Sequence, residues 1–186
     1  MDTRELTQVE SDKAAVLSGS GIAYALLFVT DTGLKKHIFD ATETVADLLI
    51  AEQVHNYDLQ PQGTDHKIMF PCIILNGSER EETKVSLYRA NQRGDKRFWP
   101  GRFKDFARAD QVFALFVANS NIVLLNLSDE PSLDTSDGSY FSEILESINF
   151  PSDETNGMGS TVAETIVEDT SSSELDEPSR FEVTSY

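Results

Sequence analysis

Four apolar runs, each bounded by turn residues, dominate the hydrophobic pattern of the first 128 residues. They cover residues 22–30, 68–75, 111–118 and 122–127 and are rich in β-branched and aromatic side chains. Runs of this length and composition predict β-strands. Residues 83–88 alternate polar and β-prone side chains, which predicts a fifth strand paired with 68–75. The short gap between the last two apolar runs is typical of a β-hairpin.

One amphipathic helix is predicted between the first two strands, over residues 41–52. Val45, Leu48 and Leu49 fall on one face of such a helix. Asp40 is placed to cap its first turn, and Glu43 to reach back to the cap. A mainly β chain with one or two helices favours an antiparallel or mixed barrel over parallel βαβ winding. The last two strands are almost wholly apolar, so we expect both of their faces to be covered.

Composition divides the chain into four segments. Residues 1–18 are polar and are expected to form a loosely held, flexible N-terminal segment, and residues 19–128 form the β-rich domain. Within residues 129–150 lies a possible amphipathic helix that would dock on the domain or on a partner. Residues 151–186 are rich in Ser, Thr, Asp, Glu and Gly. They bury too little apolar surface to offset the entropy of ordering, so we predict a disordered acidic tail.

The formal charge of −17 belongs mostly to this tail. Residues 1–128 hold 17 acidic and 14 basic residues, a net charge of −3. Residues 129–186 hold 15 acidic residues and a single basic one, Arg180, a net charge of −14. The overall acidity therefore does not exclude nucleic-acid binding by the β-rich domain.

Several functional classes find no support in the sequence. The one cysteine, Cys72, cannot form an internal disulfide, and it lies in an apolar run, as a buried hydrophobic residue does. No apolar run approaches the ~18 residues that span a bilayer, and no secretory signal is visible, so we expect a cytoplasmic protein that makes no membrane contact. No Ser-His-Asp arrangement, phosphate loop or metal-binding cluster is evident, so no cofactor is expected.

Residues 89–108 carry the clearest functional signal. This segment holds seven basic and two acidic residues, together with Trp99 and three phenylalanines. A basic, aromatic loop of this length inside an acidic protein predicts a DNA-facing arm. Gln92 or Asn91 could read adenine, and Arg93 or Arg97 could read guanine. The alternative interpretation is a solvated loop whose aromatic residues cap the core.

An earlier basic loop supplies a second group of candidates. Lys35, Lys36 and His37 follow the first predicted strand and its Asp31-Thr32-Gly33 break. Two basic loops could form the two sides of a clamp around DNA. Taken alone, His37 is more typical of a surface histidine.

The order of these features resembles the N-terminal effector-binding domain of EcoRII-type restriction endonucleases. The resemblance spans residues 22–127 and rests on the Asp31-Thr32-Gly33 motif, the loop with His37, and the run Gln92-Arg93-Gly94-Asp95-Lys96-Arg97. That family typically carries Asp-Thr-Gly after its first strand and a Thr-Arg-Asn-Glu-(Lys or Tyr)-Arg loop, with Asn where this chain has Gly94. Its fold is a DNA-binding pseudobarrel, similar to the DNA-binding domains of plant auxin response factors.

The resemblance implies a seven-stranded open barrel that grips the major groove of double-stranded DNA with two arms. It also implies a recognition module of a restriction-modification type system, working with a catalytic domain or partner protein. Asp95 would accept from cytosine N4. The candidate DNA-contacting residues are Lys35, Lys36, His37, Asn91, Gln92, Arg93, Asp95, Lys96, Arg97, Arg102 and Lys104.

Two rival functions remain open. Glu82 and Lys84 form a Glu-x-Lys that a Mg²⁺-dependent nuclease would combine with an acid such as Asp58 or Asp65. Alternatively, the protein is an interaction protein or DNA mimic whose acidic tail binds a basic partner or covers the basic arm.

Overall fold

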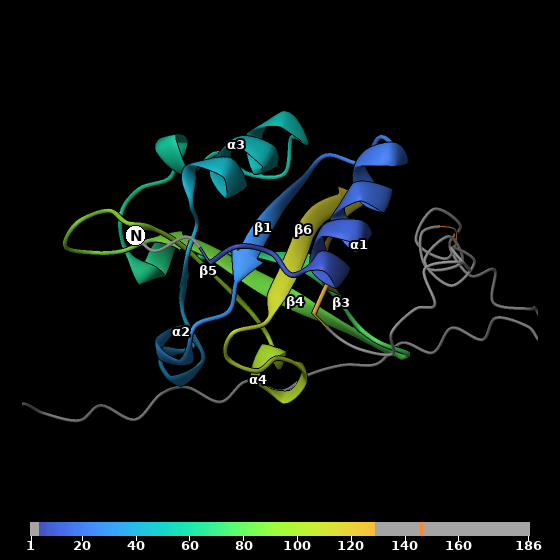
Figure 1. The fold of residues 1–186 in the computed structure, drawn as a ribbon. Helices are drawn as coiled ribbons and strands as arrows, with labels where there is room; N and C mark the ends of the chain where they lie inside the picture. Colours follow the sequence, from blue (N-terminus) through green and yellow to red (C-terminus); the bar gives the residue numbers. More distant parts are fainter. Residues whose placement is uncertain (1–3, 129–145, 147–186) are drawn as a thin grey trace, which may run out of the picture. The chain divides into compact units, whose positions relative to one another are not determined.

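The computed structural model describes residues 4–128 and residue 146, and it is mainly β (Figure 1). Its strands are β1 Tyr24–Phe28, β2 Phe39–Asp40, β3 Ile68–Asn76, β4 Glu79–Arg89, β5 Lys96–Pro100, β6 Val112–Ala118 and β7 Asn121–Asn126. Its helices are α1 Gln8–Gly19, α2 Asp31–Lys36, α3 Glu43–Ala51 and α4 Phe103–Phe106, with 3₁₀ turns η1 Tyr57–Leu59 and η2 Thr64–His66. The predicted helix at 129–150, apart from residue 146, and the predicted tail at 151–186 lie outside the described residues.

The seven strands form one sheet in the order β1-β6-β7-β3-β4-β5-β2. Neighbouring strands are antiparallel except for β3 and β7, which are parallel. The sheet curls into an open half-barrel, which confirms the predicted mixed, seven-stranded open barrel. The predicted hairpin between β6 and β7 is present, with Asn119 and Ser120 both at positive φ in its two-residue turn.

Both faces of the sheet are covered, as the apolar strands predicted. On one face, Val45 and Leu49 of α3 pack in a core cluster with Leu27 and Leu115. On the other, Leu17 of α1 packs in a second cluster with Phe116 and other strand residues. The alternating side chains of the central strands supply both cores.

The N-terminal segment differs from the sequence expectation, because residues 8–19 form the packed helix α1. Thr7 and Glu10 make a capping box that begins it. Leu17 is 0% exposed and Ala14 is 5% exposed, so these two side chains pack α1 against the sheet. The expectation of a loosely held segment was wrong for these residues. They include few apolar side chains, so the sequence shows little of the periodic pattern that indicates an amphipathic helix.

Two local predictions also need correction. The cap of α3 is Thr42, whose hydroxyl accepts from the N–H of Val45, whereas Asp40 ends β2 and pairs with Arg97. The segment 89–108 is not one long loop, because it contains β5 and α4. β5 pairs with both β4 and β2, and this pairing overrides the weak strand propensity of its charged residues.

Candidate nucleic-acid interface

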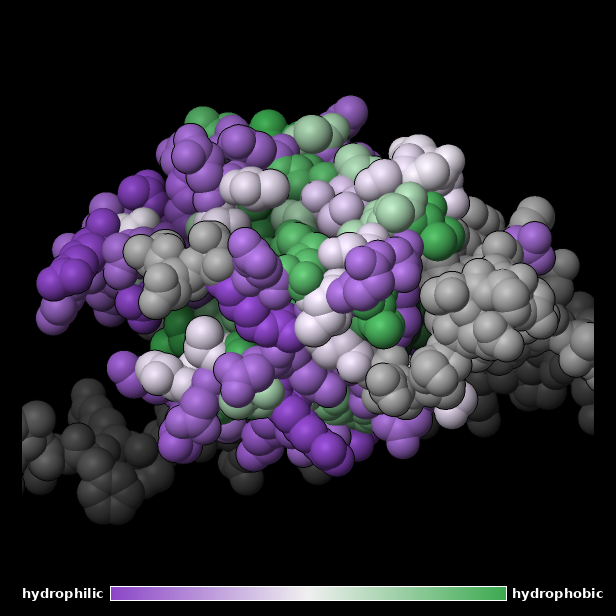
Figure 2. Space-filling view, in the orientation of Figure 1, coloured by the Kyte–Doolittle hydropathy of each residue, from purple (hydrophilic) through white to green (hydrophobic). Residues whose placement is uncertain are grey.

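The main basic segment is a compact hairpin, formed by the end of β4, residues 90–95 and the start of β5. We call residues 89–97 the arm hairpin. Arg89 and Lys96 are its last paired residues. Its turn is closed by bonds from the Ala90 N–H to the Asp95 carbonyl (2.9 Å) and from the Gly94 N–H to the Ala90 carbonyl (3.0 Å). The hairpin projects at the left of Figure 1, and that end of the molecule is strongly hydrophilic in Figure 2.

A polar segment, residues 55–66, braces the arm hairpin from one side. The hydroxyl of Tyr57, which is 0% exposed, donates to the backbone carbonyl of Arg97 over 3.1 Å. The amide of Gln60, 7% exposed, donates to the carbonyl of Leu87 over 3.1 Å. These two side chains therefore tie β4 and β5 to residues 55–66, which we call the brace.

The brace also contacts the turn of the hairpin. The Thr64 N–H donates to the side-chain oxygen of Asn91 over 3.0 Å, and the Gly63 N–H donates to the carbonyl of Arg89 over 2.9 Å. Gly94 has a φ of +70°, and a Cβ added there would lie 2.6 Å from Nε2 of Gln62. Gly94 thus permits both the turn and the close approach of the brace. Asn91, predicted as an adenine reader, serves here as a structural contact.

Ion pairs neutralise most of the charge at the base of the arm hairpin. Lys96 pairs with Asp58 of η1 at 3.0 Å, and Arg97 pairs with Asp95 at 3.1 Å. The Nε of Arg97 is buried without a hydrogen bond among the described residues, and Asp40 lies 3.6 Å from it. Three predicted DNA-contacting residues, Asp95, Lys96 and Arg97, are therefore engaged within the protein.

The tip of the arm hairpin presents two unengaged side chains. Gln92 and Arg93 are exposed, and neither makes a hydrogen bond or ion pair with the part of the chain that the structure describes. They follow the braced Asn91 and precede the braced Gly94. A guanidinium and a carboxamide thus stand side by side on a turn of fixed geometry.

The second basic segment is the helix α2 rather than the expected loop. Thr30 caps it by accepting from the Gly33 N–H over 3.0 Å. Lys35 pairs with Asp31 at 2.5 Å, whereas Lys36 is exposed and has no carboxylate partner in the described chain. His37 ends the helix at a φ of 54°, and its ring stacks on Trp99 with centroids 4.9 Å apart.

The two basic segments lie along the same strand, β5, but at different points. His37 contacts Trp99, and the paired part of the arm hairpin begins at Lys96. Three strand residues span ~10 Å. The structure therefore places His37 on the β5–β2 side of the sheet, three residues along β5 from the base of the arm hairpin.

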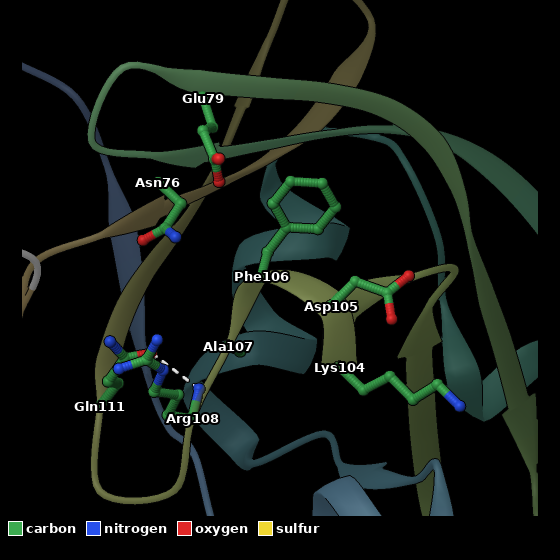
Figure 3. A pocket seen from close by; sticks show the side chains of 8 residues that line it. All are labelled: Asn76, Glu79, Lys104, Asp105, Phe106, Ala107, Arg108 and Gln111. Carbon is green, nitrogen blue, oxygen red and sulfur yellow. Dashed lines mark hydrogen bonds between the residues drawn. The ribbon is translucent and has the colours of Figure 1, made fainter.

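Arg102 and Lys104 lie at the far end of β5 from the arm hairpin. Arg102 pairs with Glu81 at 2.6 Å and with Asp105 at 3.5 Å. Lys104 lines a polar pocket of about 350 Å³ with residues of both charge signs (Figure 3). Glu79 and Asn76 face this pocket from the β3–β4 turn, and Lys104 and Asp105 extend from α4. The structure thus separates these two predicted residues from the arm hairpin. Phe103, which lies between them, packs on Trp99, the ring that stacks on His37.

The acids proposed for a nuclease site are not brought together. Glu82 pairs with Arg80, near the far end of β4. Asp58 and Asp65 both lie near Arg89, at the other end of β4. Asp58 contacts Lys96, the strand partner of Arg89. Asp65 belongs to η2, which follows Gly63, and the Gly63 N–H donates to the Arg89 carbonyl. Arg89 lies seven positions after Glu82 along β4, which corresponds to ~23 Å. Among the described residues, no group of three or more His, Cys, Asp or Glu is placed to hold a metal ion.

The remaining reactive groups have structural environments. Cys72 is 1% exposed, and burial raises the pKa of its thiol to about 12, which confirms its prediction as a buried hydrophobic residue. His55 packs its ring edge-on against Tyr57, and its Nε2 lies 3.2 Å from the side-chain oxygen of Gln60. Burial lowers the pKa of His55, although this hydrogen bond acts in the opposite direction. His55 therefore belongs to the brace.

The sequence interpretation missed the brace. Its two anchors, Tyr57 and Gln60, bond to backbone carbonyls 40 and 27 residues away, and local patterns carry no record of such contacts. One signal was available, because Tyr57 is the only aromatic residue in the polar stretch 56–65. An isolated aromatic residue in such a stretch is a candidate for a buried anchor.

Comparisons with family models, with curated proteins and with solved structures find no match to this chain. The resemblance to the EcoRII-type effector-binding domain therefore remains a prediction carried by the quoted motifs. In the described part of the chain, no helix has the length and apolar character needed to cross a membrane.

Proposed function

We propose that this protein binds double-stranded DNA through the arm hairpin, as the recognition module of a restriction-modification type system. The observation that carries the proposal is the contrast within the hairpin. Its base and turn are fixed by the brace, while Gln92 and Arg93 at its tip face solvent without partners among the described residues.

A rigid turn favours recognition of bases by the side chains that it carries. Ordering a rotamer-rich side chain and its loop costs about 0.5–1.5 kcal/mol per immobilised side chain on binding. A turn held by Asn91 and Gly94 has already incurred the backbone part of that cost. The major groove admits a two-stranded β-ribbon, and arginine and glutamine pair bidentately with guanine and adenine. In the proposal, Arg93 reads guanine and Gln92 reads the neighbouring adenine.

The other candidates take supporting roles in this proposal. In this proposal, Lys36 on α2 contacts a phosphate. Asp95 and Asp40 orient Arg97, and Asp58 orients Lys96, so these cations shape the field behind the tip. Asn91 holds the turn. Cleavage, in this proposal, belongs to a separate catalytic domain or partner protein.

A second candidate function is favoured by the same ion pairs. Lys35, Lys96, Arg97 and Arg102 all have carboxylate partners, so little free positive charge faces a phosphate backbone. Together with the net charge of −14 over residues 129–186, this supports an interaction protein or DNA mimic that binds a basic partner.

Titration of the full chain with short labelled duplexes, without Mg²⁺ and at several salt concentrations, tests the proposal. Fluorescence anisotropy should show binding, and selection from a random duplex pool should enrich one short motif containing guanine. Arg93→Ala should relax the preference at one position of that motif. Absence of binding to every duplex at low salt contradicts DNA recognition and leaves the interaction protein as the function to test.

A further inference from the structure

His37 holds a backbone conformation that glycine usually takes at the end of a helix. Its φ of 54° and ψ of 46° are left-handed. The N–H of Ile38 bonds to the carbonyl of Gly33 over 3.1 Å, and the N–H of His37 bonds to that of Leu34 over 3.4 Å. This pattern normally ends in glycine, because a Cβ is strained there. A left-handed backbone at a non-glycine residue, which His37 shares with five other described residues, is a reason to examine its side chain for a function.

The imidazole of His37 is the outermost ring of an aromatic stack. It lies nearly parallel to Trp99, at 20°, and Trp99 lies at 20° to Phe39 with centroids 5.5 Å apart. Phe103, which is 0% exposed, packs edge-on against both of these inner rings. The stack is therefore rooted in the core, and its outer member is fixed in orientation.

The His37 ring also remains accessible. The residue is exposed, and Trp99 is its one ring partner among the described residues. Within the described chain, the imidazole makes no hydrogen bond that would compete with a ligand. One face of the ring rests on Trp99, and a planar ligand can stack on the other.

The neighbouring charge indicates the class of ligand. Lys36 precedes His37, is exposed and lacks a carboxylate partner in the described chain. A rigid aromatic surface next to a cation suits a planar ring that carries a phosphate. Single-stranded nucleic acids are held in this way, by stacking of bases on aromatic side chains beside cations.

We infer that His37 is a stacking platform for an unpaired nucleobase, with Lys36 contacting the adjoining phosphate. The inference rests on the proposed function only in taking nucleic acid as the ligand. It uses a different surface from Gln92 and Arg93, and it needs a base outside the duplex stack.

The test compares two single-stranded 8-mers on the full chain, one with bases and one with abasic sites throughout. Both carry the same phosphates, so their difference in affinity isolates base stacking. The base-bearing strand should bind about fivefold more tightly or better, since each stacked base contributes ~1–3 kcal/mol. Trp99 is the only tryptophan, so its fluorescence should change with the base-bearing strand alone.

His37→Gly is the decisive variant, because glycine retains the backbone conformation and removes the ring. It should fold as the parent does and lose the preference for the base-bearing strand. His37→Asn, which also tolerates a left-handed backbone, should lose the preference equally. Lys36→Ala should weaken both strands alike and leave the preference intact.

Three results would overturn the inference: equal affinity of the parent for the two strands, no binding of either strand, or a preference that survives in a folded His37→Gly protein. The proposed function fails separately. Arg93→Ala should impair duplex binding and leave the base preference unchanged. A base preference without any duplex binding would reject duplex recognition and keep the His37 platform.

Discussion

The hydroxyl of Tyr57 donates to the backbone carbonyl of Arg97 over 3.1 Å, and this contact joins the brace to the first residues of β5. Burial, with a smaller contribution from Tyr88, raises the pKa of Tyr57 well above its ordinary value. The hydroxyl therefore stays protonated and keeps donating across the physiological pH range. Because Arg97 closes the arm hairpin, this one contact links the core to the proposed DNA-reading turn.

Tyr57→Phe should reduce the free energy of unfolding by about 0.5–1.5 kcal/mol, because the part-buried hydrogen bond to the Arg97 carbonyl is lost. DNA affinity should fall as well, since one strand of the arm hairpin is released. Urea denaturation and duplex titration measure the two effects. Tyr24→Phe is the matched control. Among the described residues, the Tyr24 hydroxyl makes one exposed hydrogen bond, with Ser18, so its removal should change neither quantity.

Arg93→Ala should weaken binding to the selected duplex by about 1–3 kcal/mol with no loss of stability. The reason is that Arg93 is exposed and makes no contact with the described chain that folding requires. Lys104→Ala removes another exposed cation, beyond the far end of β5, and should leave affinity nearly unchanged. Equal losses in the two variants would show that binding depends on general charge and not on the arm hairpin.

The affinity for duplex DNA should depend less steeply on salt concentration than is usual for a DNA-binding domain. Of the proposed contact residues near the arm hairpin, Lys36 and Arg93 lack a carboxylate partner in the described chain. Two cations brought against a duplex give a slope of log K against log salt of about −2. Release of Lys35, Lys96 and Arg97 from their carboxylates would raise the count to five and steepen the slope to about −4.5. Titrations at four or more salt concentrations separate these cases.

The fold was largely predictable because its central strands are unusually apolar. β3, β6 and β7 lie in the middle of the sheet, where both faces are buried, and such strands have a clear sequence pattern. The elements at the edges were not predictable in the same way. β5 begins with Lys96 and Arg97 and depends on pairing with β4 and β2, which is a tertiary effect.

The candidate site was predictable in composition but not in geometry. Charge and residue type identified the segments around Lys36 and Arg93. They did not distinguish a free cation from a paired one, because Asp58 and Asp40 lie 38 and 57 positions before Lys96 and Arg97 in the sequence. Only the fold shows that Gln92 and Arg93 remain available while their neighbours are engaged.

Acid should detach α1, and Glu10 is the group responsible. Its carboxylate is 1% exposed and accepts hydrogen bonds from Arg4 at 2.9 Å, from the Thr7 N–H at 2.8 Å and from the hydroxyl of Ser128. Burial alone would raise the pKa of Glu10, but these bonds together with the Arg4 charge lower it more, so the net shift is downward. Glu10 thus ties the start of α1 to Ser128, two residues after the end of β7.

A carboxyl whose pKa is lower in the folded state stabilises the fold above its unfolded pKa, near 4.3 for glutamate, and this stabilisation is lost as pH falls through the folded value. At pH 7, Glu10→Gln should therefore reduce the free energy of unfolding by roughly 1.5–3 kcal/mol, since its bonds involve a charged acceptor. The difference between parent and variant should shrink below about pH 4. Urea denaturation at pH 7, 5 and 3 measures it, with exposed Glu5→Gln as the control. A difference that stays constant with pH would assign the loss to packing and reject the role of the Glu10 charge.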